Sequence, residues 1–211
     1  MVTSNKDLMT QARETLSGRW GLAVGTFFVY MLIMGAISYS PPYHHTELSG
    51  GGNISVGGNI LMLLVGGAFA LGVATFSLAI ARKEDAKLKM IFSGFKYYGK
   101  TLGLYLLMIL FVLLWMLLLI VPGIIAAISY SLAFFLMSDD PNIGAMDAIN
   151  KSKKMMYGYK WKYFCLCCRF IGWCILGILS LGIGFLWIIP YMNVSFAKFY
   201  EDVKDNFVEG Q

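Results

Sequence analysis

Long uninterrupted runs of hydrophobic residues make up most of the chain, and short polar stretches separate them. The longest run, Thr101–Met137, has no charged residue and would form a single helix of about 55 Å. The hydrocarbon core of a bilayer is only about 30 Å thick, so this run must fold back, and Pro122-Gly123 is the expected turn. The pattern predicts six hydrophobic segments in three hairpins: Gly21–Ser40, Asn59–Ala81, Leu102–Val121, Gly123–Met137, Tyr163–Leu179 and Ile183–Ala197.

The third of these hairpins is the shortest, and Ser180–Gly184 is its expected turn. Its two arms barely match the thickness of a bilayer. Two arrangements therefore stay open, because the hairpin either spans the membrane or re-enters on the same side. Both arrangements return the C-terminus to the side on which the N-terminus lies.

Composition places the chain outside the range of ordinary soluble domains. Hydrophobic residues make up 58% of its 211 residues and charged residues only 14%, whereas soluble domains average about 45–50% and 25%. We therefore predict an all-α, polytopic integral membrane protein that forms a single membrane domain over residues 1–211.

The positive net charge is explained by the orientation of the chain in a membrane rather than by nucleic-acid binding. The formal net charge is +5, and all Lys and Arg residues except Arg169 fall in residues 1–20, 82–101, 138–162 and 198–211. The longest predicted outer loop, Pro41–Gly58, has no Lys or Arg. Such asymmetry is the positive-inside pattern of membrane proteins. It predicts that both termini are cytoplasmic and that the protein is multi-pass in the cytoplasmic (inner) membrane.

Two stretches have the pattern of amphipathic helices that lie on the cytoplasmic membrane surface. Ile143–Met156 places apolar residues along one face, with Asp140 as the expected N-cap and Pro141 at the first helical position. Near the N-terminus, Ser4 and Asp7 form a capping pattern ahead of an apolar stripe. We expect both helices to lie with the apolar side on the membrane. The alternative is a solvated helix that packs on another protein.

A basic and aromatic junction precedes each hairpin, and this recurrence indicates three degenerate repeats, over residues 1–81, 82–137 and 138–205. Internal repeats are common in membrane proteins. The junctions are LSGRWG (Leu16–Gly21), FKYYGKTLG (Phe95–Gly103) and MMYGYKWKYF (Met155–Phe164). Each hairpin also ends in a short motif followed by charged residues: Ser77-Leu78-Ala79, Ser131-Leu132-Ala133 or Ser195-Phe196-Ala197.

Basic and aromatic side chains at the predicted cytoplasmic boundary are the candidate lipid contacts. Cations near the surface attract anionic head groups by about 1 kcal/mol each, and tryptophan and tyrosine favour the head-group level. Arg169 lies slightly inside the fifth segment, where it either extends back to the interface or contacts an anion. By the same reasoning Trp187 is expected near the opposite interface. The candidate set is Arg19, Trp20, Lys100, Lys151, Lys153, Lys154, Lys160, Trp161, Lys162 and Arg169.

Residues that carry catalysis are sparse. No Asp or Glu falls within a predicted span, and Asp139 and Asp140 end the fourth segment, where helix capping accounts for them. No Ser/His/Asp set, P-loop or HExxH motif occurs. We therefore predict that the protein is not an enzyme and has no catalytic, cofactor-binding or metal-ligating residue.

Two clusters resemble metal sites only in part. His44 and His45 lie near Glu47 in a glycine-rich loop that gives adjacent histidines no defined geometry. The fifth segment contains all four cysteines, namely Cys165, Cys167, Cys168 and Cys174. A zinc site needs a second pair of ligands, which this segment lacks. We expect the cysteines to pack as small apolar residues, with palmitoylation of Cys165 as the alternative.

Four stretches have a distinctive combination of residues: LWMLLLIVPGII (Leu114–Ile125), AMDAINKSKKMMYG (Ala145–Gly158), FIGWCILGILSLGIGFLWIIPY (Phe170–Tyr191) and FYED (Phe199–Asp202). Together they resemble the bacterial integral membrane family called domain of unknown function 975. The resemblance is specific over Phe92–Asp202 and looser before it, and it does not include the cysteine cluster or the glycine-rich loop. It implies a multi-pass protein of the bacterial inner membrane and brings no reaction, cofactor or catalytic residue.

The leading hypothesis is a non-enzymatic membrane protein that organises lipids or supports a membrane partner complex. The expected partners are anionic lipid head groups on the cytoplasmic face, together with a membrane protein partner or a second copy of this chain, and not nucleic acid. The alternative is a transporter or permease component with broken helices near Pro122 and Pro190. A polar cavity between the hairpins at mid-membrane depth would favour this alternative.

Overall fold

The computed structural model describes residues 3–38 and 56–207, and every regular element in those residues is a helix. The predicted all-α class is therefore confirmed for this part of the chain. His44, His45 and Glu47 lie outside the described residues. The helices are α1 (Asn5–Leu16), α2 (Trp20–Ser38), α3 (Val56–Ala81), the 3-10 helix η1 (Leu88–Tyr97), α4 (Tyr98–Leu118), α5 (Ile120–Tyr130), α6 (Ala133–Asp139), α7 (Ala145–Met155), α8 (Lys160–Leu179) and α9 (Phe185–Asp205).

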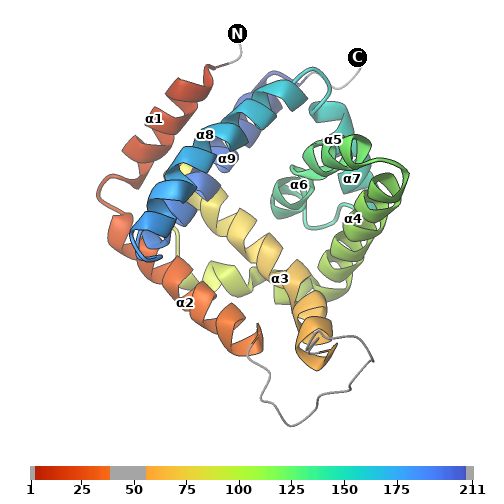
Figure 1. Ribbon diagram of the computed structural model, residues 1–211, viewed down its shortest axis with the longest axis horizontal. Helices are drawn as coiled ribbons and strands as arrows, with labels where there is room; N and C mark the ends of the chain where they lie inside the picture. The colour runs from red at the N-terminus through yellow and green to blue at the C-terminus, as the bar shows by residue number, and fades with distance from the viewer. Residues whose placement is uncertain (1–2, 39–55, 208–211) are drawn as a thin grey trace.

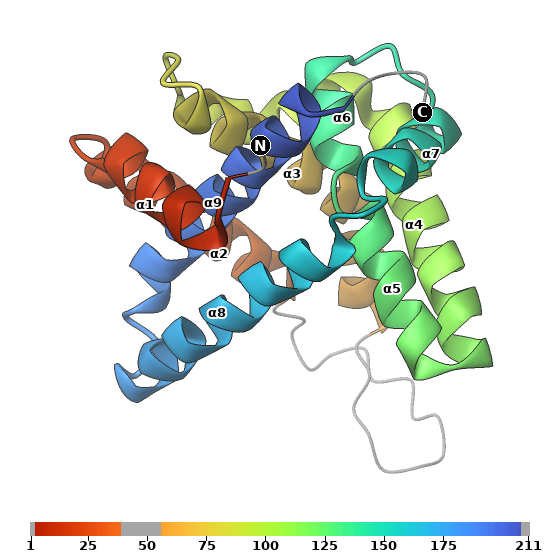
Figure 2. The same cartoon turned by 90° about the horizontal axis from the view of Figure 1, so that it is seen from above.

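The helical turns and the short helices lie at different ends of the molecule (Figures 1 and 2). The turn between α4 and α5, residues 118–120, and the turn between α8 and α9, residues 180–184, lie at the lower edge of Figure 2 on opposite sides of the view. In the same view α1, α6, α7 and the end of α9 lie above them. We call the two turns the hairpin end, and α1, α6, α7 and the last turns of α9 the corner end.

Five helical segments of the described chain are long and apolar enough to cross a bilayer: Trp20–Ile37, Leu61–Ala81, Leu88–Leu118, Ile120–Asp139 and Lys160–Leu179. These ranges correspond to the first five predicted segments. The sixth, Ile183–Ala197, lies in α9, which continues through charged residues to Asp205 and is not among the five. The sixth span therefore stays a prediction.

The turn inside the longest apolar run lies at Leu119 rather than at the predicted Pro122-Gly123. Leu119 is extended, with φ −161° and ψ 146°, and separates α4 from α5. Pro122 lies in the first turn of α5, where a proline lacks only an N–H that the helix leaves unpaired. The proline therefore marks the start of a helix. Pro190, the other expected break, lies inside α9, which runs unbroken from Phe185 to Asp205.

The two predicted surface helices bury their apolar faces on the protein itself. Leu8, Ala12 and Leu16 of α1 are buried, and α1 packs against α9. Helix α7 buries Ala148 and Ile149 and packs against α4 and α6. The expectation that the apolar face of α1 lies on the membrane is therefore wrong, because α9 covers it. On α7 it is wrong for Ile149, which is buried, whereas Met146 of the same helix is exposed.

The starts of these two helices differ in how well the sequence predicted them. The Ser4 hydroxyl accepts the N–H of Asp7 at 3.2 Å, as the capping pattern predicted. Helix α7 begins at Ala145 with Gly144 as its N-cap, not after Asp140. The Asp140 carboxylate instead accepts the N–H of Asn142 at 2.9 Å, so this residue stabilises a turn ahead of the helix.

The packing of η1 across α3 depends on two glycines. A Cβ added to Gly72 would lie 1.8 Å from the carbonyl oxygen of Ile91, and one added to Gly94 would lie 2.0 Å from that of Ala68. No side chain fits at either position, so the two backbones touch directly. This contact places η1, and with it the start of α4, firmly against the middle of the molecule.

Candidate functional site

Charged residues at the ends of three helices meet in one network at the corner end. Arg82, directly after α3, contacts Asp139 at the end of α6 through Nη1 and Oδ1 at 2.8 Å and through Nη2 and Oδ2 at 2.9 Å. It also donates to Glu201 of α9 at 2.7 Å. The Tyr200 hydroxyl donates to Asp139 at 2.8 Å, and Lys204 forms an ion pair with the same carboxylate. Asp139 therefore joins α3, α6 and α9 and does more than cap a helix.

The interactions in this network keep the protonation states of Arg82 and Tyr200 constant around neutral pH. Hydrogen bonds to Asp139 and then to Glu201 raise the pKa of the Arg82 guanidinium above its ordinary value. Burial, followed by the hydrogen bond to Asp139, raises the pKa of the Tyr200 phenol. Both groups therefore keep their protons at neutral pH. A bidentate Arg–carboxylate pair is also geometrically specific, so the network fastens three helix ends in one arrangement.

Three of the predicted lipid contacts serve as tethers between junctions and helix ends. Arg19 donates to two carbonyl oxygens just after α3, at 2.6 and 3.2 Å. Lys100 donates to two carbonyl oxygens of the α6–α7 connection, both at 3.1 Å. Lys162 pairs with Asp202 at 2.7 Å, and its side chain is only 19% exposed. These cations contact the protein, and the sequence did not indicate these contacts because their partners lie far along the chain. Lipid contact at these residues stays a prediction.

Two of the junctions have the same backbone geometry. Gly18 follows α1 with φ +80°, and Gly158 follows α7 with φ +82°. The N–H one residue later bonds the carbonyl oxygen three residues back in both, from Arg19 to Leu16 and from Tyr159 to Met156. The left-handed φ favours glycine. The internal repeat stays a prediction, and this shared corner supports it for the first and third copies.

The third junction also lines a hollow at the corner end. Lys153 and Lys154 are exposed and lie in the last turn of α7. Together with two amide and two phenol side chains they border a cavity of about 940 Å³. We call this cavity the lysine hollow, and its lining is Asn150, Lys153, Lys154, Met155, Tyr157, Gly158, Tyr159, Asn206 and Phe207.

The remaining candidates lie around the same junction and along α8. Trp161 is 73% exposed and stacks on Phe164, with ring centroids 5.4 Å apart. Lys151 and Lys160 are half-buried, and Arg169 is exposed on α8. Trp161 and Arg169 are therefore accessible to a surface that adjoins α8.

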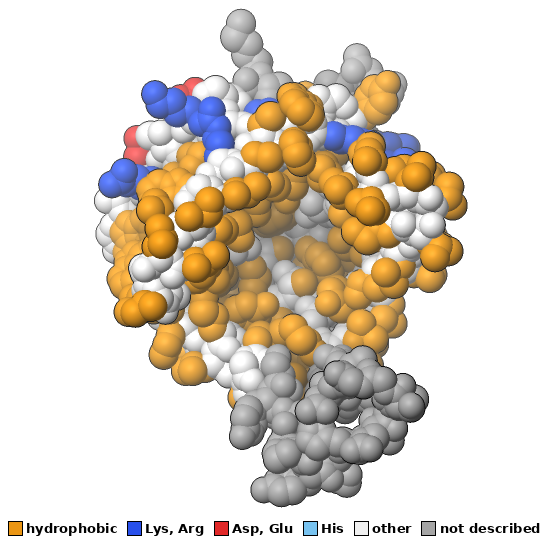
Figure 3. All heavy atoms as spheres, viewed as in Figure 1, with side chains coloured by type: hydrophobic (Ala, Val, Ile, Leu, Met, Phe, Trp, Pro, Cys, Tyr) orange, Lys and Arg blue, Asp and Glu red, His pale blue; other side chains and the backbone are white. Residues whose placement is uncertain are grey.

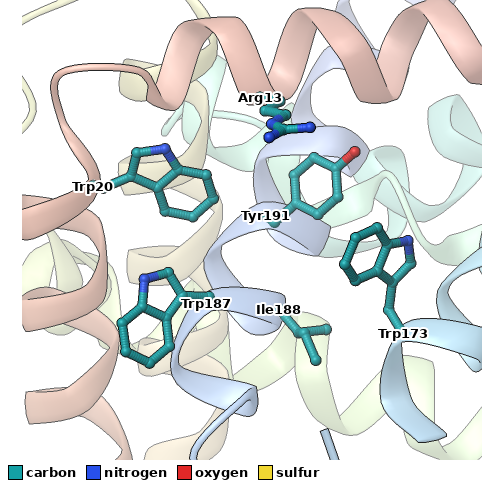
Figure 4. Close-up of a pocket in the computed structure, with 6 residues that line it drawn as sticks. All are labelled: Arg13, Trp20, Trp173, Trp187, Ile188 and Tyr191. Carbon is teal, nitrogen blue, oxygen red and sulfur yellow. The ribbon is translucent and has the colours of Figure 1, made fainter. Parts of the chain in front are cut away.

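A second cavity lies between α1, α2, α8 and α9 and is lined mainly by aromatic rings. It has a volume of about 220 Å³, and Figure 4 shows the rings gathered below the Arg13 side chain. The expectation that Trp187 lies near the opposite interface from Trp20 is wrong, because both tryptophans line this one cavity. Its lining is Arg13, Trp20, Trp173, Trp187, Ile188 and Tyr191.

The cysteines and the acidic residues do not gather into a metal-binding group. Cys165, Cys167 and Cys174 are half-buried and Cys168 is exposed. Within residues 3–38 and 56–207, no group of three or more His, Cys, Asp or Glu side chains could hold a metal ion. The cysteines of α8 are free thiols, and palmitoylation of Cys165 stays a prediction.

Charged and hydrophobic side chains occupy different parts of the molecular surface (Figure 3). Figure 3 shows hydrophobic side chains over most of the visible face, Lys and Arg along its upper part, and a hollow between the α8 side and the α4–α5 side. Hydrophobic side chains border this hollow. A molecule with several apolar helices and such a surface is compatible with a membrane protein.

Comparison with known proteins agrees with the resemblance that the sequence motifs suggested. The family model described as protein of unknown function (DUF975) matches residues 1–133 and 116–207. No curated protein and no solved structure matches the chain. The two matched ranges together include every helix of the described residues. The chain belongs to the DUF975 family of proteins of unknown function.

Proposed function

We propose that the protein is a non-enzymatic, multi-pass membrane protein that binds anionic lipid head groups at its corner end and so organises the lipids around it. The lysine hollow carries this proposal. Lys153 and Lys154 are exposed beside the amides of Asn150 and Asn206 in a cavity of about 940 Å³. Ammonium, amide and phenol groups all donate hydrogen bonds, and phosphate oxygens accept them.

The position of the hollow favours a lipid phosphate over a soluble one. It lies at the corner that leads into α8, and α8 is apolar enough to cross a bilayer. Each lysine near an anionic surface contributes about 1 kcal/mol to attraction. The distribution of Lys and Arg along the chain supports an inner-membrane location with both termini cytoplasmic.

The test compares two variants of equal charge. Purified protein is reconstituted in nanodiscs that contain phosphatidylglycerol and phosphatidylcholine in equal amounts, and retained lipids are counted by native mass spectrometry. We expect the wild type to retain phosphatidylglycerol preferentially. Lys153→Gln/Lys154→Gln should lose this preference, whereas Lys89→Gln/Lys96→Gln, which removes two exposed cations of η1, should keep it.

Each outcome of this comparison is informative. Equal retention by both variants and the wild type would remove the lysine hollow as a lipid site. Equal loss in both variants would mean that general positive charge, and not the hollow, attracts the lipid. Competition by free glycerol phosphate at millimolar concentration would indicate a soluble phosphate ligand instead.

The transporter alternative has less support from the geometry. It predicted polar groups between the hairpins, whereas hydrophobic side chains border the hollow seen in Figure 3. It also predicted a broken helix near Pro190, and α9 runs unbroken through this residue. Lipid acyl chains suit the hydrophobic hollow of Figure 3 better than a polar solute does.

A further inference from the structure

We infer that α8 and α9 form a re-entrant hairpin whose tip, residues 178–183, ends inside the hydrocarbon core of the bilayer and contacts acyl chains. The inference rests on the membrane location proposed above, but it needs neither the lysine hollow nor a particular orientation. It resolves the two arrangements that the sequence left open for this hairpin.

The tip presents hydrophobic side chains to its surroundings. Leu181 is 93% exposed, Leu179 is 73% exposed and Ile178 is 66% exposed. Ser180 is the only polar side chain in residues 178–183, and its hydroxyl is fully used within the turn. It donates to the carbonyl oxygen of Gly177 and accepts the N–H of Gly184, both at 2.8 Å. No water is required to satisfy this side chain.

The backbone N–H groups of the tip are equally well satisfied. Every N–H from Ser180 to Ile188 donates to an acceptor inside the hairpin, at 2.8 to 3.2 Å. In hydrocarbon each backbone polar group must find such an internal partner, because an unpaired one costs several kcal/mol. Non-helical turns normally fail this condition. The turn between α8 and α9 meets it for all nine of its N–H groups, so lipid can surround it.

The turn between α4 and α5 provides the contrast. Leu119 donates to Trp115 at 3.1 Å and accepts from Gly123 at 3.3 Å. Ile120 and Val121 occupy the first positions of α5, where a helix supplies no acceptor for its own N–H groups. This second tip is as apolar as the first, but it has polar backbone groups that favour the head-group region.

The depth that the α8–α9 tip can reach is limited by the docking of α9 on α1. The Tyr191 hydroxyl donates to the carbonyl oxygen of Met9 in α1 at 3.2 Å. Helix α1 has exposed charged side chains, including Lys6 and Arg13, so it lies in water or among head groups. The chain from Leu181 to Tyr191 rises only about 15 Å at helical pitch, which is half of the hydrocarbon thickness.

The aromatic cavity supports the same depth. Trp187, close to the tip in sequence, lines the same cavity as Trp20 and Arg13 (Figure 4), and these two belong to the first junction and to α1. A tip beside this level cannot also reach the opposite interface. Helix α8 accordingly runs obliquely, at a wide angle to α4 and α5 (Figure 2).

The experiment measures the accessibility of single cysteines in the full-length protein in native membranes. The four native cysteines are replaced by serine, and Leu181→Cys is the probe. Ser49→Cys, in the predicted outer loop, and Lys83→Cys, between α3 and η1, are the matched controls for the two sides. Intact cells and inside-out vesicles are treated with a membrane-impermeant maleimide, and total thiol is measured after denaturation.

We expect Leu181→Cys to react at least about tenfold more slowly than the accessible control from either side, because apolar surroundings disfavour the reactive thiolate. Labelling from the outer side at the rate of Ser49→Cys would overturn the inference, since the hairpin would then span. Labelling from the inner side at the rate of Lys83→Cys would overturn it too, since the tip would lie in water.

Two further measurements separate the possible failures. If Leu181→Cys does not accumulate, Ile183→Cys, which is also exposed at the tip, replaces it. A fluorophore on the tip cysteine should be quenched more strongly by lipids brominated near the chain end than by lipids brominated near the head group. Recovery of the protein in the soluble fraction would refute the proposed membrane location itself, before any labelling is done.

Discussion

The corner end and the hairpin end of the molecule are built from different interactions. At the corner end, Arg82 joins two carboxylates from separate helices, and the Tyr200 hydroxyl and the Lys204 ammonium complete the connections. At the hairpin end, leucines such as Leu117 and Leu181 are 86% and 93% exposed. One end is held by specific polar pairs and the other presents uniform apolar surface.

This difference indicates that the two ends lie in different surroundings, one in water or among lipid head groups and the other in hydrocarbon. Charged pairs and tethers form where water or lipid head groups can accommodate the charges that remain unpaired. The apolar tip of the α8–α9 hairpin is stable where hydrocarbon replaces water. Substitutions at the packed interior and the corner end should therefore cost more stability of the detergent-solubilised protein than equivalent substitutions on α8, which leads to the hairpin end. Matched pairs of variants measure this inequality.

The largest difference is expected for glycine to alanine. In Gly72→Ala the new Cβ would lie 1.8 Å from the carbonyl oxygen of Ile91, so η1 and α3 must separate. We expect a loss of about 3 kcal/mol in the free energy of unfolding. Gly172→Ala in α8 adds its Cβ to open space and should be neutral or stabilising by about 0.5–1 kcal/mol. Thermal unfolding followed by circular dichroism measures both. Equal melting temperatures would mean that α3 and η1 are not in close contact.

The second difference concerns arginine. Arg82→Ala leaves Asp139 and Glu201 without their main partner. These side chains are partly exposed, so we expect a loss of about 2 kcal/mol, less than for a fully buried pair. Arg169→Ala, in which an exposed arginine of α8 is removed, should change stability by no more than about 0.5 kcal/mol. The same thermal measurement applies, and a larger effect at Arg169 would reverse the comparison.

Much of the hairpin end could be predicted from the sequence because its signals are local. The length of an apolar run decides whether it must fold back, and the turn then lies close to the residues that break the pattern. Pro122-Gly123 was therefore nearly correct, although Leu119 forms the turn. The capping pattern of Ser4 and Asp7 is also local, and it is confirmed.

The corner end could not be predicted in the same way because its partners are remote in sequence. Nothing near Asp139 indicates that Arg82 and Tyr200 will meet it. Likewise Lys162 and Lys154 both occur in basic stretches, yet within the described part of the chain only Lys162 of the two forms an ion pair with a carboxylate, that of Asp202. The local pattern thus identified the cations, and the packing of the helices decided which of them contact the protein.

A smaller effect is expected at Gly18 and Gly158, and it tests whether the turns after α1 and α7 are equivalent. In Gly158→Ala a side chain must adopt φ +82°, which costs about 1 kcal/mol, and Gly18→Ala at φ +80° should cost the same. Gly99→Ala at the remaining junction adds its Cβ to open space without a left-handed φ, so no loss is expected there. Melting temperatures of the three variants measure this. A loss in only one of the first two would argue against a shared corner.

The smallest effect concerns pH at the tether between Lys162 and Asp202. Burial raises the pKa of the Asp202 carboxyl, but hydrogen bonds from Lys162 and Thr3 outweigh it, so the pKa lies below its ordinary value. A carboxyl with a lowered pKa in the folded state contributes stability above its unfolded pKa of about 3.9, and the contribution disappears as pH falls through the folded pKa. The melting temperatures of wild type and Asp202→Asn should therefore differ by a constant amount between about pH 5 and 8 and converge below about pH 4.

Asp85→Asn, which removes an exposed carboxylate paired with Lys87, should show a smaller difference throughout. A difference for Asp202→Asn that persists unchanged below pH 4 would mean that the variant acts through packing and not through the charge of the tether.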